Sequence, residues 1–274
     1  MLSVLENLMK APITIDKEST IADVVKIMLD KKISRVLVTE NGKINSITTE
    51  KDLGLFLLKD KSDRTLQQIP LSELARSLLT IPQSTDIQKC AKMMLDNNIG
   101  SVGILSEDKK IVGIITKTDL VKYFASNHQN EKKVGDYMSE NYYWVYSDAS
   151  LSDVASKMLE YRISRLIVRN KEEIPVGIIS FRDLFEIVMS MGAQRDIVFP
   201  KSFDSEHGLG KTQYADEVMK NEILTVGYND DLSQACQTLL DGKINGAGVL
   251  SDSGKLIGIL SKTNIIKAIA SLSH

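Results

Sequence analysis

At four junctions between a β-rich segment and a helical pattern, a hydroxyl residue is followed three positions later by a carboxylate or, in the last copy, by an amide. The motif reads Thr49-Glu50-Lys51-Asp52, Thr116-Lys117-Thr118-Asp119, Ser180-Phe181-Arg182-Asp183 and Ser261-Lys262-Thr263-Asn264. Each copy joins a β-rich segment to a helical pattern, so its spacing predicts a capping box at a helix N-terminus. The N–H groups and positive dipole of such a terminus also suit a phosphate, and a carboxylate there can accept hydrogen bonds from a ribose diol. Spacing alone leaves both interpretations open, a structural cap and a nucleotide site.

The elements that must position these motifs are repeated four times along the chain. Each repeat has a short strand, a capped amphipathic helix, two strands joined by a turn, and a second helix. In the first repeat Thr20 is the predicted N-cap, and Ile21, Val24, Val25 and Met28 form the apolar stripe of the helix. Four copies in one register predict an α/β protein built from four β-α-β-β-α units.

The predicted repeats occupy residues 4–60, 69–126, 134–191 and 214–271, and residues 192–213 are interpreted as a linker or insertion of unknown role. The insertion ends in Gly208-Leu209-Gly210-Lys211-Thr212, which is similar to a phosphate-binding P-loop. Ser205 stands where the first glycine of a P-loop is required, and no clear strand precedes the segment. We therefore do not expect a nucleoside triphosphatase.

Composition limits the function classes further. The 274 residues are 43% hydrophobic and 26% charged, as in soluble globular proteins, and the net charge of −2 argues against a sequence-independent nucleic-acid binder. The N-terminus lacks a secretory signal and no apolar run is long enough to span a bilayer, so we expect a cytoplasmic protein without a membrane partner. Cys90 and Cys236 are predicted core residues, and the isolated histidines indicate no metal site.

Taken in order, the capped first helix, the Gly-Ile-Ile-Ser/Thr strand and the Ser/Thr-x-x-Asp turn make the four units resemble cystathionine β-synthase (CBS) domains. Asp136-Tyr137-Met138 and Glu217-Val218-Met219 match the start of such domains. The resemblance implies that CBS domains pair into two Bateman modules, in a disc-like assembly similar to the γ subunit of the AMP-activated protein kinase. It also implies a regulatory energy sensor that binds AMP, ADP or ATP and transmits occupancy to an unknown regulated protein. No enzymatic activity and no other cofactor are expected.

The resemblance implies roles for the turn residues as well. Asp52, Asp119 and Asp183 match the carboxylate that holds the ribose in this family, whereas Asn264 departs from it, so the fourth site is expected to be weakest or empty. The first repeat departs too, because Asn45-Ser46-Ile47-Thr48 replaces the usual strand sequence. The remaining turn residues that the resemblance places at the ribose or the phosphates are Thr49, Thr116, Ser180, Arg182, Ser261 and Lys262.

Two arginines match the family's phosphate-binding positions, in Ser34-Arg35 and Ser164-Arg165. The even repeats have the uncharged pairs Gly100-Ser101 and Asn245-Gly246 there. A solvated arginine held by a salt bridge is the alternative interpretation. The predicted adenine pocket comprises Thr14, Ile33, Thr80, Gly100, Ile163, Thr225, Asn245 and Gly246.

Two other functions remain open from the sequence. One is a structural or oligomerisation scaffold whose clefts bind nothing. The other is a sensor of a different adenosyl ligand, such as S-adenosylmethionine or NAD, or of a nucleic acid. The sequence does not determine the number of filled sites, the regulated partner, or whether the chain forms a homodimer.

Overall fold

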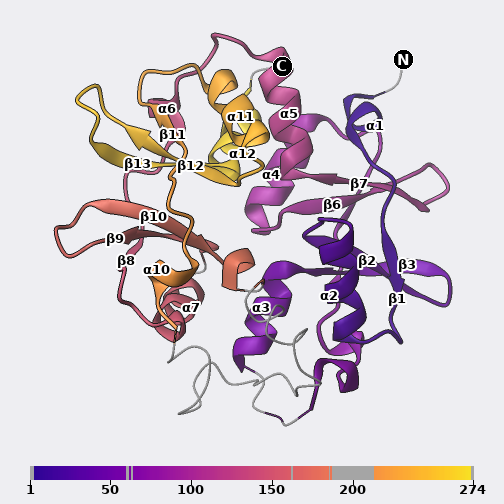
Figure 1. The fold of residues 1–274 in the computed structure, drawn as a ribbon. Helices are drawn as coiled ribbons and strands as arrows, with labels where there is room; N and C mark the ends of the chain where they lie inside the picture. The colour runs from indigo at the N-terminus through magenta and orange to yellow at the C-terminus, as the bar shows by residue number, and fades with distance from the viewer. Residues whose placement is uncertain are drawn as a thin grey trace. The chain divides into compact units, whose positions relative to one another are not determined.

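The structure is a computed structural model, and it describes residues 3–59, 62, 64–161, 163–184, 186 and 213–272. Four small sheets with flanking helices make up the described chain (Figure 1). The mixed α/β class and the repeated β-α-β-β-α unit are as predicted. The predicted insertion lies outside the described residues except for Gln213, and so does the segment that is similar to a P-loop.

Repeats one and three form one of two compact units, which spans Ile13–Ser77 and Tyr143–Ile223. Repeat one contains β1 (Thr14–Asp16), α2 (Ile21–Asp30), β2 (Arg35–Glu40), β3 (Lys43–Thr49) and α3 (Glu50–Lys59), followed by the turns η1 (Leu66–Gln68) and η2 (Leu71–Glu73) and by β4 (Arg76–Ser77). Repeat three contains β8 (Trp144–Tyr146), α7 (Leu151–Glu160), β9 (Arg165–Arg169) and β10 (Pro175–Ser180), then helical residues 181–184, and α10 (Ala215–Val218) follows.

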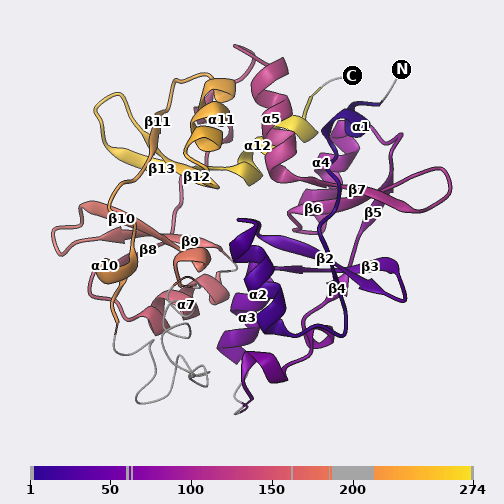
Figure 2. The same cartoon turned by 45° about the vertical axis from the view of Figure 1, so that its right-hand side comes forward.

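Repeats two and four form the other compact unit together with the N-terminal segment (Figure 2). This unit begins with α1 (Val4–Leu8). Repeat two then contains β5 (Thr80–Pro82), α4 (Ile87–Asp96), β6 (Ser101–Leu105), β7 (Ile111–Thr116) and α5 (Lys117–Asn127), followed by α6 (Val134–Tyr137). Repeat four contains β11 (Thr225–Gly227), α11 (Leu232–Asp241), β12 (Gly246–Leu250), β13 (Leu256–Ser261) and α12 (Lys262–Ala270).

Each sheet has the same order of strands. The first strand pairs in parallel with the second, and the second pairs antiparallel with the third, as in β5-β6-β7. In the sheet of repeat one, β4, which lies just before the first strand of repeat two, pairs with the far edge of β3 and gives the order β1-β2-β3-β4. The predicted turn between β2 and β3 is confirmed: Asn41 (φ 50°) and Gly42 (φ 73°) both adopt the left-handed conformation that a two-residue hairpin loop requires.

The first helix of each repeat begins at the predicted N-cap residue, and three of these helices are followed by a residue with a positive φ angle. Thr20, Asp86, Ser150 and Asp231 each accept a hydrogen bond from the backbone N–H three residues later, which satisfies one of the free donors at the helix start. Beyond the ends of α2, α4 and α11, Lys32, Asn98 and Lys243 have positive φ angles and turn the chain out of the helix.

The unit of repeats two and four has one continuous hydrophobic core, to which α4, α5, α11 and α12 all contribute. Cys90 and Cys236 lie fully buried in this core, as the sequence predicted. Burial raises the pKa of each thiol to about 12, so neither forms a reactive thiolate at neutral pH. Repeats one and three have separate cores of their own.

The residues just before the first strand of each repeat, here called its leading segment, pair with the third strand of a neighbouring repeat. Lys10 of repeat one bridges Ile114 in β7 of repeat two, and Arg76 of repeat two pairs with Ile47 in β3 of repeat one. The same exchange relates repeats three and four, through the bridges Ser139–Ile259 and Lys220–Ile178. Each third strand is thus paired with a backbone segment that the sequence places just before the first strand of another repeat.

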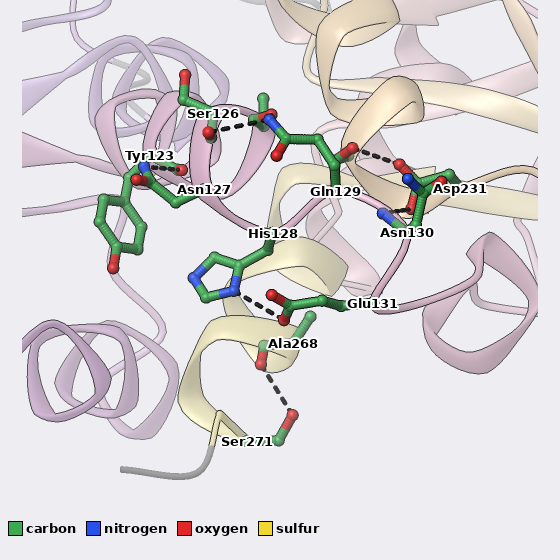
Figure 3. A network of polar contacts seen from close by, with 12 residues as sticks. Tyr123, Ser126, Asn127, His128, Gln129, Asn130, Glu131, Asp231, Ala268 and Ser271 are labelled. Atoms are coloured by element: carbon green, nitrogen blue, oxygen red, sulfur yellow. Dashed lines mark hydrogen bonds and ion pairs between the residues drawn. The ribbon is translucent and has the colours of Figure 1, made fainter.

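The connection from repeat two to repeat three is fixed to the first helix of repeat four (Figure 3). The Asn130 N–H donates to Oδ1 of Asp231 at 3.0 Å, and the Val134 N–H donates to the Asp230 carbonyl at 3.0 Å. His128 ends α5 and lies 2.8 Å from Glu131 through Nδ1. None of the helices in the described part of the chain is long and apolar enough to cross a membrane.

Candidate ligand site

Strand register brings the two predicted halves of the site together. In every repeat the first residue of the second strand lies opposite the hydroxyl residue that ends the third strand. Arg35 faces Thr49 and Arg165 faces Ser180, whereas Ser101 faces Thr116 and Gly246 faces Ser261. Antiparallel neighbours of this kind have Cβ atoms about 5 Å apart. The predicted phosphate arginines therefore lie beside the predicted ribose motif in repeats one and three.

The predicted capping box is present in all four copies of the motif. One oxygen of the fourth residue accepts hydrogen bonds from both the backbone N–H and the hydroxyl of the first. The distances are 3.1 and 2.6 Å at Asp52, 2.9 and 2.6 Å at Asp119, 2.7 and 2.5 Å at Asp183, and 2.8 and 2.5 Å at Asn264. The structural interpretation of the motif is thus correct, and any ligand role is additional to it.

These four residues are among the few buried polar residues of the described chain. Asp52 is 8% exposed, Asp119 2%, Asp183 7% and Asn264 3%. A buried carboxylate needs compensation by hydrogen bonds and by positive charge. The cap supplies the hydrogen bonds through one oxygen, Oδ2, and leaves the other oxygen for a second partner.

That second partner is a cation from the leading segment of a neighbouring repeat. Oδ1 of Asp119 lies 2.5 Å from Lys10 Nζ, and Oδ1 of Asp52 lies 2.7 Å from Arg76 Nε. Oδ1 of Asp183 lies 3.5 Å from Lys220 Nζ. Sequence reasoning missed these three cations. Their signal is a basic residue four or five positions before the first strand, but only the exchange of leading segments places it on a carboxylate.

Repeat four replaces the ion pair with neutral hydrogen bonds. Asn264 Nδ2 donates to the Tyr137 carbonyl at 2.8 Å and to the Ser139 hydroxyl at 3.1 Å, while its Oδ1 makes the cap. Ser139 occupies the position of Lys10 and Lys220 in the leading segment. The whole amide is therefore engaged within the protein, and the weakness of a fourth site stays a prediction.

Arg165 is the phosphate candidate whose surroundings are most informative. Its Nη2 donates to the Ser164 hydroxyl at 3.4 Å, whereas Nη1 is buried and has no hydrogen-bond partner among the described residues. Burial lowers the pKa of Arg165 to about 10, and the nearby Asp183 carboxylate opposes this effect. The guanidinium remains charged at neutral pH. In repeat one the equivalent Arg35 donates from Nη2 to the Ser34 hydroxyl at 3.3 Å.

Two further predicted ligand residues already contact the opposite repeat of their own unit. Nε and Nη2 of Arg182 donate to Oε1 of Glu50 at 2.9 and 2.5 Å. In the other unit Lys262 Nζ donates to the Thr118 hydroxyl at 2.9 Å, and Lys117 Nζ donates to the Thr263 hydroxyl at 3.0 Å. The N-termini of paired second helices thus face each other through an ion pair in one unit and through two lysine–threonine contacts in the other.

The residues of the predicted adenine pocket occupy matching places in the repeats. Thr14, Thr80 and Thr225 begin the first strands. Gly100 and Asn245 precede the second strands, and their carbonyls accept the N–H of the first residue of α5 and of α12. The remaining predicted members are the half-buried Ile33 and Ile163 and the buried Gly246. These positions are equivalent by register, and their contact with a ligand stays a prediction.

A model of the CBS domain matches residues 5–58, 71–126, 134–190 and 215–271. The chain belongs to the CBS domain family. Protein MJ1225 of Methanocaldococcus jannaschii is 21% identical over 95% of this chain and 96% of its own length. Its crystal structure matches with a TM-score of 0.81 at 20% identity, over 97% of this chain and 99% of that one, and is described as a proposed archaeal homologue of γ-AMPK. This similarity shows a shared fold over nearly the whole chain.

Other relatives match only part of the chain. The homoserine O-acetyltransferase of Methanococcus vannielii is 30% identical over 53% of this chain, and the match covers 27% of that enzyme. A CBS-domain protein of Pyrobaculum aerophilum, solved as a complex with AMP, is 19% identical over 43% of this chain and 90% of its own, with a TM-score of 0.38.

Proposed function

We propose that this chain is a regulatory protein that binds a phosphorylated adenosine at repeats one and three and passes its occupancy on to a partner protein. The observation that carries the proposal is the buried Nη1 of Arg165, for which the described residues offer no hydrogen-bond partner, in the strand that faces the cap of Asp183. A buried donor without a partner costs about 1–3 kcal/mol. A phosphate oxygen at this position would remove that cost, because the planar guanidinium matches phosphate with two parallel hydrogen bonds.

The negative charge of Asp183 suits the ribose of a nucleotide, and the positive charge of the neighbouring Arg165 suits its phosphate. The carboxylate can accept a hydrogen bond from a ribose hydroxyl, and Arg165, which faces the Ser180 hydroxyl across the hairpin, can hold a phosphate. Repeat one repeats this combination with Asp52 and Arg35. The even repeats have Ser101 and Gly246 in the arginine position, so we assign them lower affinity or none.

We assign the chain a binding role and not a catalytic one. The enzymes among its relatives share only a part of their length with it, so their activities are not transferred. No set of three or more His, Cys, Asp or Glu side chains suited to a metal ion occurs among the residues that the structure describes.

Calorimetric titration of the full chain with adenosine, AMP, ADP, ATP, S-adenosylmethionine and NAD tests the proposal. We expect affinity to rise from adenosine to AMP, to fall with added salt, and to be lost for AMP in the Arg165→Met variant. Arg169→Met, which removes another arginine of the same strand, is the matched control. Equal affinity for adenosine and AMP would contradict the phosphate role, and tighter binding of S-adenosylmethionine or NAD would favour a different adenosyl ligand. Binding of none of them would favour a scaffold.

A further inference from the structure

The cations on the three ribose carboxylates are themselves largely exposed. The side chains of Lys10, Arg76 and Lys220 are 57%, 62% and 61% exposed, whereas the carboxylates that they contact are nearly buried. Such a side chain can move into water without leaving an unsatisfied buried group of its own. The carboxylate stays buried when the cation moves away. The cation can therefore leave only where other groups near the carboxylate compensate its negative charge.

The acceptor capacity of each carboxylate is limited. In Asp183, Oδ2 already accepts hydrogen bonds from the N–H and the hydroxyl of Ser180. Oδ1 is the oxygen that remains, and it faces Lys220. A ribose diol offers two hydroxyl donors to the carboxylate, so full engagement of the diol and the contact with Lys220 compete for the same oxygen. The same competition applies to Arg76 at Asp52 and to Lys10 at Asp119.

Repeats one, two and three differ in the positive charge left beside the carboxylate when the leading-segment cation departs. Arg165 stays beside Asp183, and Arg35 faces the cap of Asp52. Asp119 has Ser101 opposite its cap, so Lys10 is the cation on which its buried charge depends. Removing one partner of such a pair leaves an uncompensated charge, which is strongly unfavourable.

We propose that Lys220 and Arg76 are intramolecular occupants of the ribose positions in repeats three and one, which the ligand's diol displaces. Lys10, by contrast, is a permanent counter-ion that keeps Asp119 closed to ligand. This inference rests on the proposed function. It adds that side chains of the protein itself compete with the ligand for the carboxylate. The backbone of Lys220 stays bonded to Ile178 through two hydrogen bonds of 2.9 and 3.0 Å, so only its side chain has to move.

The test compares AMP with 2′-deoxy-AMP, which lacks one hydroxyl of the diol. Their dissociation constants are measured by calorimetry on the full chain, for the wild type and for Lys220→Met. The effect of the lost positive charge on the phosphate is common to both ligands and cancels in the ratio of their dissociation constants. We expect the preference for AMP over 2′-deoxy-AMP to rise about two- to fivefold in Lys220→Met, the range for loss of one exposed ion pair.

Lys10→Met is the matched control, because it removes the equivalent cation in repeat two. It should leave the AMP preference unchanged and lower the midpoint temperature of unfolding, which Lys220→Met should not do to the same extent. A ratio that stays the same or falls in Lys220→Met, with AMP binding to the wild type intact, would overturn this inference alone. Failure of the wild type to bind any adenosyl ligand would overturn the proposed function and this inference with it.

Discussion

The Asp side chain of the Ser/Thr-x-x-Asp motif caps a helix, and we propose that its negative charge also binds the ligand. Substitutions can separate these two roles. Asn264 shows that an amide makes the same two cap hydrogen bonds as the carboxylates, at 2.8 and 2.5 Å. Asp183→Asn should therefore fold with a stability close to that of the wild type. It should also weaken AMP binding by about 1.5–3 kcal/mol, the range for a hydrogen bond to a charged group. Urea denaturation and calorimetry give the two values.

Asp183→Ala is the companion variant, since it loses the cap as well as the charge. Its unfolding free energy should fall by about 1 kcal/mol relative to Asp183→Asn. Unchanged AMP affinity in both variants, with normal folding, would remove the carboxylate from the ligand site and leave it as a helix cap.

Glu50 provides a prediction about pH. Its burial raises the pKa of the carboxyl above the usual 4.5, while the hydrogen bond and charge of Arg182 oppose the rise. The native chain thus holds this proton more tightly than the unfolded chain. The contribution of Glu50 to the unfolding free energy therefore falls as the pH rises above 4.5, and it is constant once the native carboxyl is ionised.

Glu50→Gln removes this dependence. The unfolding free energy of the wild type relative to Glu50→Gln, measured in urea between about pH 4 and 7, should decline with rising pH. Asp23→Asn is a useful comparison at still lower pH: hydrogen bonds to Thr20 lower the pKa of Asp23 from 3.8, so its contribution should rise as the pH rises toward that value and stay nearly constant above it. A Glu50 contribution that also rises with pH would mean that the ion pair with Arg182 outweighs burial.

At the scale of elements, close crossing of the leading segments explains where glycine is needed in the third strands. A Cβ on Gly177 would lie 2.5 Å from Met219 Sδ and 2.7 Å from the Lys220 carbonyl, and one on Gly258 would lie 2.6 Å from the Ser139 carbonyl. Repeat one has Ser46 in place of this glycine, and the next residue, Ile47, pairs with Arg76. The residue before Arg76 is Ala75, where the other leading segments have methionine. A larger strand residue is thus matched by a smaller crossing residue, which accounts for the departure of repeat one from the usual strand sequence.

This complementarity predicts unequal effects of alanine in equivalent strands. Gly258→Ala should destabilise the chain by about 1–3 kcal/mol, because backbone must shift to make room. Gly113→Ala should cost less, since its Cβ would meet only the flexible Met9 side chain, 2.8 Å away at Sδ. Met9→Ala should restore stability to Gly113→Ala, in a double-mutant cycle followed by urea denaturation. Equal losses for the two glycine variants would contradict the assignment.

At the scale of the whole molecule, the sequence predicted the four repeats and their internal order because helix caps and apolar stripes are local signals. The amphipathic pattern of α4 shows that one face is buried, but it does not say which helix covers that face. The common core of α4, α5, α11 and α12 could therefore not be predicted. The exchange of leading segments was missed for the same reason, and with it the cations on Asp52, Asp119 and Asp183. Arg165 was named from the sequence because the resemblance to CBS domains points to its position, and its phosphate role stays a prediction.

The number of ligand sites per chain depends on these non-local contacts, and repeat four tests them. In the sequence, Asn264→Asp restores the carboxylate that the other three copies of the motif carry. In the fold, however, its second oxygen would face the Tyr137 carbonyl in place of the present 2.8 Å hydrogen bond, and no cation is supplied by Ser139. The carboxylate oxygen and the carbonyl oxygen are both acceptors, so they repel each other when no proton lies between them. The buried negative charge would also have no cation beside it from the leading segment.

We therefore expect Asn264→Asp to lower the unfolding free energy by about 1–3 kcal/mol and to add no AMP site to the two that we propose at Asp52 and Asp183. Adding Ser139→Lys should recover much of that loss, because it rebuilds the pair that Lys10 makes with Asp119. The double variant should still bind no further AMP, since Gly246 leaves the position opposite Ser261 without an arginine. Urea denaturation measures the first two effects and calorimetric stoichiometry the third. A stable Asn264→Asp variant with an additional AMP site would show that the carboxylate alone makes a site, and that neither the leading-segment cation nor the opposed arginine selects among the repeats.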